Sequence, residues 1–287
     1  MLPFSIPSPD ISSFSIGPLT IHIYALCLLT GMAVAWWLGR KRWVARGGNA
    51  ETFESIVLWA IPVGIIFARI YHVLTHWDDY FGPGPNLNPF FIWEGGIAMF
   101  GSLLGGTFAA VLVCRYYGAR VSSLTDALAP GLLFAQAIGR LGNWFNQELF
   151  GGPDDGPLGL EIDPQYRPAE YADVPTFQPT FLYELVWNAT GGLLLLWLDR
   201  RFPLGRGKLI SLYMVVYGTG RFFIEGIRTD FSYMIGPLRT NQLTALVVAL
   251  AGAIMFAALL RWAPGREDTV EPGREAKQAE APADASD

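Results

Sequence analysis

The sequence predicts an all-α polytopic membrane protein with about seven transmembrane helices. Hydrophobic residues make up 52% of its 287 positions and charged residues only 16%, whereas roughly 25% of the residues in soluble domains are charged. The apolar residues also form long runs that are nearly free of charge, and about 20 such residues cross roughly 30 Å of hydrocarbon. A water-soluble globule needs far more charge to cover its surface, so that class is nearly excluded.

The charge balance and the cysteine count exclude two further classes. The 20 Lys and Arg residues are outnumbered by 25 Asp and Glu residues, giving a net charge of −5, which is unfavourable for binding nucleic acid. Two cysteines are too few for a disulfide framework or a Cys-rich zinc site.

Seven apolar spans are expected along the chain. They cover about residues 20–39, 53–75, 92–114, 124–145, 179–198, 209–227 and 240–261. The fourth span is the weakest, because Pro130 and the polar stretch after Gly139 interrupt it. Pro62 is able to kink or end the second span.

Lys and Arg gather in alternate loops, which predicts the orientation of the chain. They follow the first, third, fifth and seventh spans and are scarce in the other loops. Because cytoplasmic loops are enriched in Lys and Arg, we expect the N-terminus outside the cell and the C-terminus in the cytoplasm.

Three regions are expected. Residues 1–19 form an extracytoplasmic segment without the basic start of a signal peptide, and residues 20–262 form the transmembrane domain that would hold the functional site. The acidic outer loop at about 147–178 is long enough to form a small extracytoplasmic lobe. Residues 263–287 are rich in Ala, Pro and charge, which predicts a disordered cytoplasmic tail.

Arginines inside the spans are the most informative residues, because an ionisable group there costs at least about 2.5–3.5 kcal/mol on insertion scales. Arg221 shares one helical stripe with Tyr217, Glu225 and Arg228. Two interpretations stay open: Arg221 and Glu225 form a structural ion pair between helices, or Arg221 is the cationic wall of a cavity within the membrane.

A second polar group surrounds Arg140. Gly139 and Gly142 permit close backbone approach and a broken helix here, and non-helical backbone survives at membrane depth only where it is buried or lines a cavity. The polar side chains either converge on a ligand or only cap and bridge helices; they are Arg140, Asn143, Asn146 and Glu148. Bidentate arginine suits phosphate, so the expected ligand is a phospholipid that enters from the bilayer.

The other reactive side chains are interpreted as structural. Arg69 shares a stripe with His72 and His76, and snorkelling towards the interface is favoured over a two-histidine metal pair. Cys27 and Cys114 lie in apolar spans without an adjacent base, as buried hydrophobic residues do. The sequence predicts neither a metal nor a cofactor.

The run from Gly139 to Gly151 closely resembles the signature of the prolipoprotein diacylglyceryl transferases. Further segments agree in order over roughly residues 18–262; they are His22–Tyr24, Arg69–Tyr71, Trp93–Gly96, Asp126 with Ala129-Pro130, Gln178–Glu184 and Tyr217–Arg228. Two positions depart from the family pattern. Phe100 stands where many members have His, and Gln178 precedes Pro179 where His is frequent.

The resemblance implies an enzyme of the bacterial cytoplasmic (inner) membrane. It would transfer the diacylglyceryl group of phosphatidylglycerol to the thiol of the lipobox cysteine of a preprolipoprotein, releasing glycerol phosphate. Its partners would be phosphatidylglycerol, the signal peptides of preprolipoproteins and the lipid bilayer, and no cofactor or nucleic acid is implied. The nucleophilic cysteine belongs to the substrate.

Roles for individual residues follow from this reaction. Arg140 and Arg221 would bind the phosphate and, with Glu148 and Tyr217, form the catalytic set. The remaining substrate-binding residues would be Asn143, Asn146, Gly151, Tyr24, Glu225, His22, Asp126 and Tyr183. Glu148 and Glu225 would orient the arginines, and three candidates stay open for the base of the thiol: His22, Glu148 or a water held by Tyr217.

Two other classes of function are weighed against this one. A transporter or channel for an anionic solute would explain the intramembrane arginines, but not the series of motifs, and the sequence lacks the internal repeat typical of many transporters. A non-catalytic phospholipid-binding protein would fit a family member that has lost its base.

Overall fold

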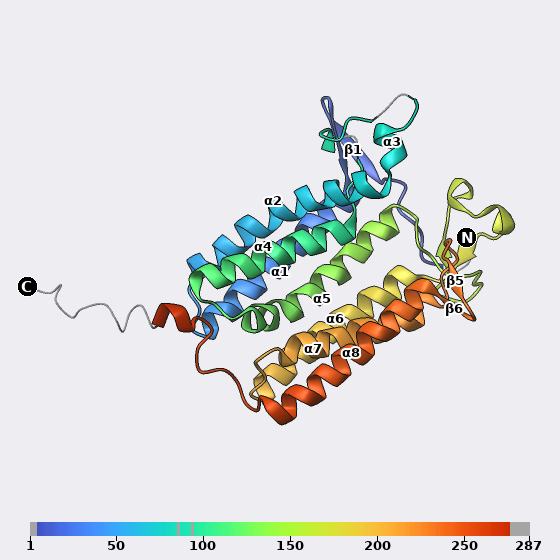
Figure 1. Ribbon diagram of the computed structural model, residues 1–287. Helices are drawn as coiled ribbons and strands as arrows, with labels where there is room; N and C mark the ends of the chain where they lie inside the picture. Colours follow the sequence, from blue (N-terminus) through green and yellow to red (C-terminus); the bar gives the residue numbers. More distant parts are fainter. Residues whose placement is uncertain (1–4, 85–86, 93–94, 276–287) are drawn as a thin grey trace, which may run out of the picture. The chain divides into compact units, whose positions relative to one another are not determined.

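The computed structural model describes residues 5–84, 87–92 and 95–275, and Figure 1 shows that long helices dominate it. Trp93 and Glu94, which belong to one of the resembling segments, lie outside the described residues. The helices are α1 (Ile23–Ala45), α2 (Ala50–Thr75), α3 (Trp77–Phe81), α4 (Met99–Tyr117), α5 (Val121–Phe145), α6 (Thr180–Arg201), α7 (Lys208–Glu225) and α8 (Thr240–Trp262), with 3-10 turns at Pro164–Tyr166 and Ala169–Tyr171.

The described strands form three short antiparallel pairs at the ends of helices. The pairs are β1 (Ser13–Ile16) with β2 (Leu19–His22), β3 (Leu160–Glu161) with β4 (Thr176–Phe177), and β5 (Met234–Ile235) with β6 (Leu238–Arg239). The first pair leads directly into α1 and the last leads directly into α8.

Six helices of the described chain are long and apolar enough to cross a membrane. Several such helices are typical of a multi-pass membrane protein. The six are α1, α2, α4, α5, α6 and α8, and each coincides with one of the predicted spans. The remaining predicted span, 209–227, coincides with α7. This helix is not among the six, and its 18 residues include three charged ones, Lys208, Arg221 and Glu225.

The second span does not end at Pro62, and the interruption expected in the fourth span is wrong. Pro62 lies inside the continuous helix α2, and Pro130 lies inside α5, which runs unbroken past Gly139 and Gly142 to Phe145. Half of the apolar stretch of α5 is buried in the protein. This burial against neighbouring helices outweighs the poor helix-forming tendency of Pro130 and the two glycines.

The chain divides into two compact units. The first combines the chain up to Gly39 with Thr125–Arg266, and the second combines Arg40–Leu124 with the chain from Glu267 onward. Within the first unit α7 packs against both α6 and α8, and within the second α2 packs along α4 (Figure 1). All the predicted site residues belong to the first unit.

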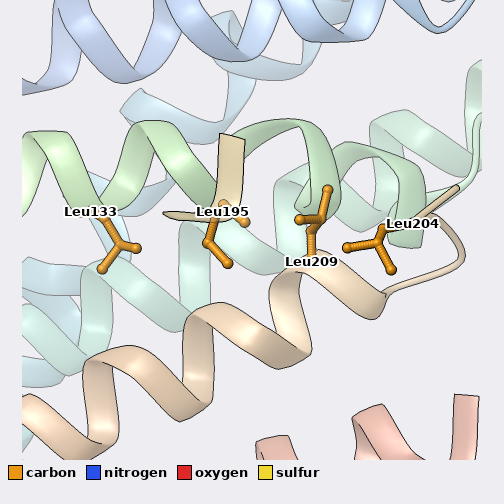
Figure 2. Packing of buried hydrophobic residues seen from close by; sticks show 5 residues of the cluster. Leu133, Leu195, Leu204 and Leu209 are labelled. Carbon is orange, nitrogen blue, oxygen red and sulfur yellow. The ribbon is translucent and has the colours of Figure 1, made fainter. Parts of the chain in front are cut away.

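A leucine cluster joins α5, α6 and the start of α7. Figure 2 shows Leu133, Leu195, Leu204 and Leu209 facing one another, and each is at most 6% exposed. Burying one such side chain is worth about 1.5–3 kcal/mol. The cluster therefore fixes the three helices that carry the site.

The segment at about 147–178 forms a small lobe with an apolar core of its own. Leu160, Ile162 and Phe177 are at most 3% exposed, and Phe150 and Phe181 pack against them. The N–H of Ile6 donates to the carbonyl of Gly159, which ties the N-terminal segment to the lobe.

The segment predicted to be a disordered tail is ordered at its beginning. Val270 is 1% exposed, and its carbonyl accepts a hydrogen bond from the N–H of Arg120. Glu271 accepts one from the N–H of Asn49, and Glu267 accepts one from Ser123. The expectation of disorder is therefore wrong for residues 263–275, because one apolar residue and two acids find partners in the loops; residues 276–287 lie outside the described residues.

Candidate functional site

A buried carboxylate lies between the two arginines that the sequence singled out. Glu184 of α6 is 5% exposed. Its Oε2 lies 2.8 Å from Nε of Arg140 on α5, and its Oε1 lies 3.3 Å from Nη1 of Arg221 on α7. The structure thus brings Arg140 and Arg221 together through an acid that the predicted site did not include.

The three side chains meet because of the direction in which their helices run. Arg140 lies near the end of α5, Glu184 near the beginning of α6, and Arg221 near the end of α7. The chain reverses direction between α5 and α6 and again between α6 and α7, so these ends come together. Thr180, the first residue of α6, donates a hydrogen bond to the carbonyl of Leu149 and fixes this helix start.

Glu225 is the centre of a second group of ion pairs. It is fully buried, and its Oε2 lies 2.7 Å from Nη2 of Arg221 and 3.6 Å from Nη1 of Arg228. Its Oε1 lies 3.3 Å from Nε of Arg239 and accepts a hydrogen bond of 3.0 Å from Asn241. The ion pair between Arg221 and Glu225 that the sequence suggested is present, as one part of a larger network.

Asp230 closes this network. Its Oδ1 lies 2.7 Å from Nε of Arg228, and its Oδ2 lies 3.6 Å from Nη2 of Arg239. Burial acts to lower the pKa of the Arg228 guanidinium, but the hydrogen bond and charge of Asp230, followed by the charges of Glu225 and Glu184, raise that pKa above its ordinary value.

The polar residues after Arg140 form a chain of hydrogen bonds. Arg140 donates from Nη1 to Oδ1 of Asn143 at 2.9 Å, and Asn143 donates to Oε1 of Glu148 at 2.8 Å. Asn146 donates to the same oxygen at 3.2 Å. The four side chains are thus in contact with one another, and Glu148 belongs to the same network as Arg140.

The backbone leaves the helical conformation after Phe145, not at the two glycines. Gln147 and Leu149 have φ values of 51° and 60°, and such strain costs of order 1–3 kcal/mol for each residue. It turns the chain so that Glu148 between them reaches back to Asn143. Gly142 does permit the close backbone approach that the sequence suggested, because a Cβ there would lie 2.5 Å from Cδ2 and 3.1 Å from Cα of Tyr24.

Both charge signs are equally represented in the network. Its cations are Arg140, Arg221, Arg228 and Arg239, and its anions are Glu148, Glu184, Glu225 and Asp230.

These partners do not occupy all the N–H groups of Arg140 and Arg221, the two arginines of the predicted phosphate site. Among the described residues, Nη2 of Arg140 and Nε of Arg221 have none, and the two side chains are 20% and 17% exposed. Their free N–H groups can receive an anion.

Other predicted residues lie around this network. The N–H of Gly151 donates to the carbonyl of Gln178 at 3.0 Å, and a Cβ at Gly151 would lie 2.7 Å from Cβ of Gln178. Tyr217 stacks on Tyr213, with ring centroids 5.8 Å apart, and borders the leucine cluster. Tyr183 directly precedes Glu184 on α6.

Asp126 lies away from the arginines. It is fully buried, and its carboxylate accepts hydrogen bonds of 2.9 Å from the N–H groups of Gly207 and Ile210. These groups belong to the beginning of α7, about 21 Å along α5 from Arg140 at 1.5 Å per residue. The structure thus places Asp126 as an anchor for α7 and does not bring it together with the other predicted substrate-binding residues.

The histidines do not join the network in the described chain. His22 ends β2 and is exposed, and His72 and His76 stack on each other in the second unit. Phe100, the departure from the family pattern, is 58% exposed near the beginning of α4. The described residues contain no group of three or more His, Cys, Asp or Glu that could hold a metal ion.

Arg69 is buried and does not snorkel, so that interpretation is wrong. It is 7% exposed and donates hydrogen bonds to loop carbonyls. The acceptors are Asn88, Pro89, Phe91, Gly95 and Gly96. Arg69 therefore shapes the loop before α4.

Four charged participants in the network are missing from the predicted site: Glu184, Arg228, Asp230 and Arg239. A signal for Glu184 existed, because it lies inside the predicted span 179–198 and closes the resembling segment Gln178–Glu184. The rule that draws attention to intramembrane arginines applies equally to acids. Arg228 closes the resembling segment Tyr217–Arg228 and shares the stripe of Arg221, so a signal existed for it too. Asp230 and Arg239 lie outside the predicted spans, where a charge gives no such signal.

Comparison with known proteins assigns the family. The family model of prolipoprotein diacylglyceryl transferase matches residues 12–258. A phosphatidylglycerol–prolipoprotein diacylglyceryl transferase of Cutibacterium acnes is 52% identical over 265 residues, covering 92% of this chain and 89% of the relative. Another from Streptomyces griseus is 45% identical, covering 96% and 84%, and one from Streptomyces coelicolor is 42% identical, covering 92% and 83%. The chain belongs to the prolipoprotein diacylglyceryl transferase family.

Proposed function

We propose that this protein transfers the diacylglyceryl group of phosphatidylglycerol to the thiol of a lipobox cysteine in a preprolipoprotein, and that glycerol phosphate is released. Family membership supports the reaction. The observation that carries the site is the pair Arg140 and Arg221, held on both sides of Glu184 with N–H groups still free. The partners are therefore phosphatidylglycerol, the signal peptide and the surrounding bilayer.

The reaction is a displacement at the glyceryl carbon bound to phosphate. The substrate thiol loses its proton to a base, since the thiolate is the nucleophile. The new S–C bond forms as the C–O bond breaks, and the electron pair of the C–O bond stays on the phosphate oxygen. Negative charge thus moves from sulfur to phosphate, where pre-positioned donors stabilise it; losing one such donor typically lowers a rate by about 10²–10³-fold.

Each residue of the network has a place in this scheme. Arg140 and Arg221 bind the phosphate through their free N–H groups, while Glu184 and Glu225 hold their guanidinium groups in position. Asn143 and Asn146 order Glu148 and bind the glycerol head. Of the three candidates for the base, Glu148 is the one that hydrogen-bonds into the network.

The seven-span topology remains part of the proposal. α7 lies between α6 and α8 in the fold, and its charged residues Arg221 and Glu225 belong to the network, so they need not face lipid. With α7 as a span, the positive-inside rule places the N-terminus, the lobe and the arginines on the outer side of the bacterial inner membrane.

The test is a transfer assay with purified protein, phosphatidylglycerol labelled in its acyl chains, and a lipobox peptide. Label on the peptide, absent when its cysteine is replaced by serine, is the expected result. Uptake of anionic solute into vesicles without label transfer would favour a transporter. Binding of the lipid without transfer would favour a non-catalytic lipid-binding protein.

A further inference from the structure

A cavity of about 520 Å³ lies beside Glu148 in the first unit. Its walls come from four parts of the chain: the end of α5, the lobe, the loop after α7 and the N-terminal segment. The residues that line it include Ser12, Asn146, Glu148, Tyr166, Thr229 and Asp230. The volume falls within the roughly 300–1,000 Å³ typical of ligand sites.

The cavity shares two acids with the ion-pair network. Glu148 accepts both amide hydrogen bonds on Oε1, and among the described residues its Oε2 has no partner. Asp230 is held in place by Arg228 and Arg239. The wall between these acids includes Thr229, whose hydroxyl donates to the carbonyl of Phe150. The cavity thus offers fixed acceptors for N–H groups.

We propose that this cavity binds the polypeptide substrate on the C-terminal side of its acceptor cysteine. The inference rests on the proposed function and adds the location of a second part of the substrate. The apolar segment of a signal peptide precedes the cysteine and suits the bilayer, whereas the residues that follow it belong to the mature protein and need water. These residues must leave the site through an aqueous opening.

The geometry places that opening next to the reaction centre. Arg140 is separated from Glu148 by two hydrogen bonds through Asn143. A thiol positioned beside Arg140 therefore has its following residues close to Glu148, and an extended chain covers about 3.3–3.6 Å per residue. Three or four residues after the cysteine would traverse the cavity, with their backbone N–H groups near Glu148 and Asp230.

The charges of the wall favour a peptide over the released product. Glycerol phosphate is an anion, and the lining of the cavity includes two acidic side chains, Glu148 and Asp230. Like charges repel each other at close range. Peptide N–H groups, in contrast, are donors that match these oxygens.

Two acceptor peptides test the inference in the purified full-length protein. One ends as an amide at the cysteine, and the other continues for four residues. We expect the longer peptide to have a kcat/KM at least about tenfold higher, mainly through KM, because remote contacts contribute binding energy. Thr229→Trp, which fills the cavity, should reduce that advantage to less than about twofold. Thr244→Trp, the same change on the exposed side of α8, is the matched control and should preserve it.

Several outcomes would overturn the inference. Equal kcat/KM for both peptides in the wild-type protein would do so, as would an advantage that survives Thr229→Trp. Inhibition by glycerol phosphate that competes with the longer peptide only, and that disappears in Thr229→Trp, would assign the cavity to the product. Failure of both peptides to accept label would instead contradict the proposed function.

A crosslinking experiment keeps the inference testable if Thr229→Trp does not accumulate. The longer peptide carries a photoreactive residue three positions after the cysteine and is irradiated with the wild-type protein. We expect crosslinks to residues 146–150, 166–168 and 229–230. Crosslinks confined to other parts of the chain would contradict the inference.

Discussion

Oε2 of Glu184 lies 2.8 Å from Nε of Arg140, and the other oxygen of the same carboxylate lies 3.3 Å from Arg221. One buried acid therefore positions both arginines before any substrate arrives. It also compensates part of their charge, which reduces the cost of keeping two cations inside a membrane protein.

Replacing Glu184 by Gln should lower both the amount of folded protein and its rate. The change preserves the shape of the side chain but leaves Arg140 and Arg221 without their shared counter-charge, and breaking a buried pair is strongly destabilising. We expect transfer to fall by at least about tenfold, or ~1.4 kcal/mol of barrier, when it is normalised to protein level. Glu184→Asp, which preserves the charge, should lose less. A Gln variant with full rate and full abundance would refute the positioning role.

Replacing Gly142 by Ala should disturb the contact between α1 and α5. The new Cβ would lie 2.5 Å from Cδ2 of Tyr24 and 3.1 Å from its Cα, so α1 must shift. Gly139→Ala is the matched control, because its nearest neighbour, Cδ2 of Leu28, is 3.7 Å away. We expect a lower Tm and at least about tenfold slower transfer for Gly142→Ala alone. Equal behaviour of the two variants would argue against close helix contact at Gly142.

Replacing Asp126 by Asn should affect stability more than substrate binding. Its two oxygens accept N–H groups at the beginning of α7, and loss of a helix cap costs about 0.5–2 kcal/mol. The expected result is a lower Tm with an unchanged KM for phosphatidylglycerol. Asp155→Asn, on the exposed part of the lobe, should change neither quantity. A raised KM at normal Tm would return Asp126 to the substrate site.

Truncation of the C-terminus should separate two parts of the tail. A chain that ends at Glu275 should retain its Tm and its rate. A chain that ends at Arg266 loses Val270, which is 1% exposed, together with the partners of Asn49 and Ser123. Burial of a valine is worth about 1.5–3 kcal/mol, so the shorter chain should melt at a lower temperature. Identical melting curves for the two truncations would show that these contacts add no stability.

The sequence was sufficient to predict the helices, because a membrane span leaves a long apolar run. Each of the seven predicted spans coincides with a helix, and their ends differ by only a few residues, apart from the end of the first span and the start of the third. Arg140 and Arg221 also stood out, since an ion at membrane depth needs a partner. The identity of the partner depends on a third helix, and a pattern within one helix does not contain that information.

The incorrect expectations share a physical cause. Pro130, Gly139 and Gly142 are weak helix formers, yet α5 is continuous because neighbouring helices bury half of its span. Val270 lies in a strongly polar segment, and its burial depends on loops far away in the sequence. In each case contacts between distant parts of the chain outweigh local preference.

The most direct test of the phosphate site is the turnover of Arg140→Lys, measured with labelled phosphatidylglycerol and normalised to the amount of protein in the membrane. Lysine preserves the positive charge opposite Glu184. It lacks the planar guanidinium group, whose several N–H donors can contact Glu184, Asn143 and a phosphate at the same time. We predict normal abundance and a fall in turnover of at least about 100-fold, the scale seen when one pre-positioned donor is lost. Near-normal turnover in this variant would contradict the proposal that Arg140 binds the phosphate.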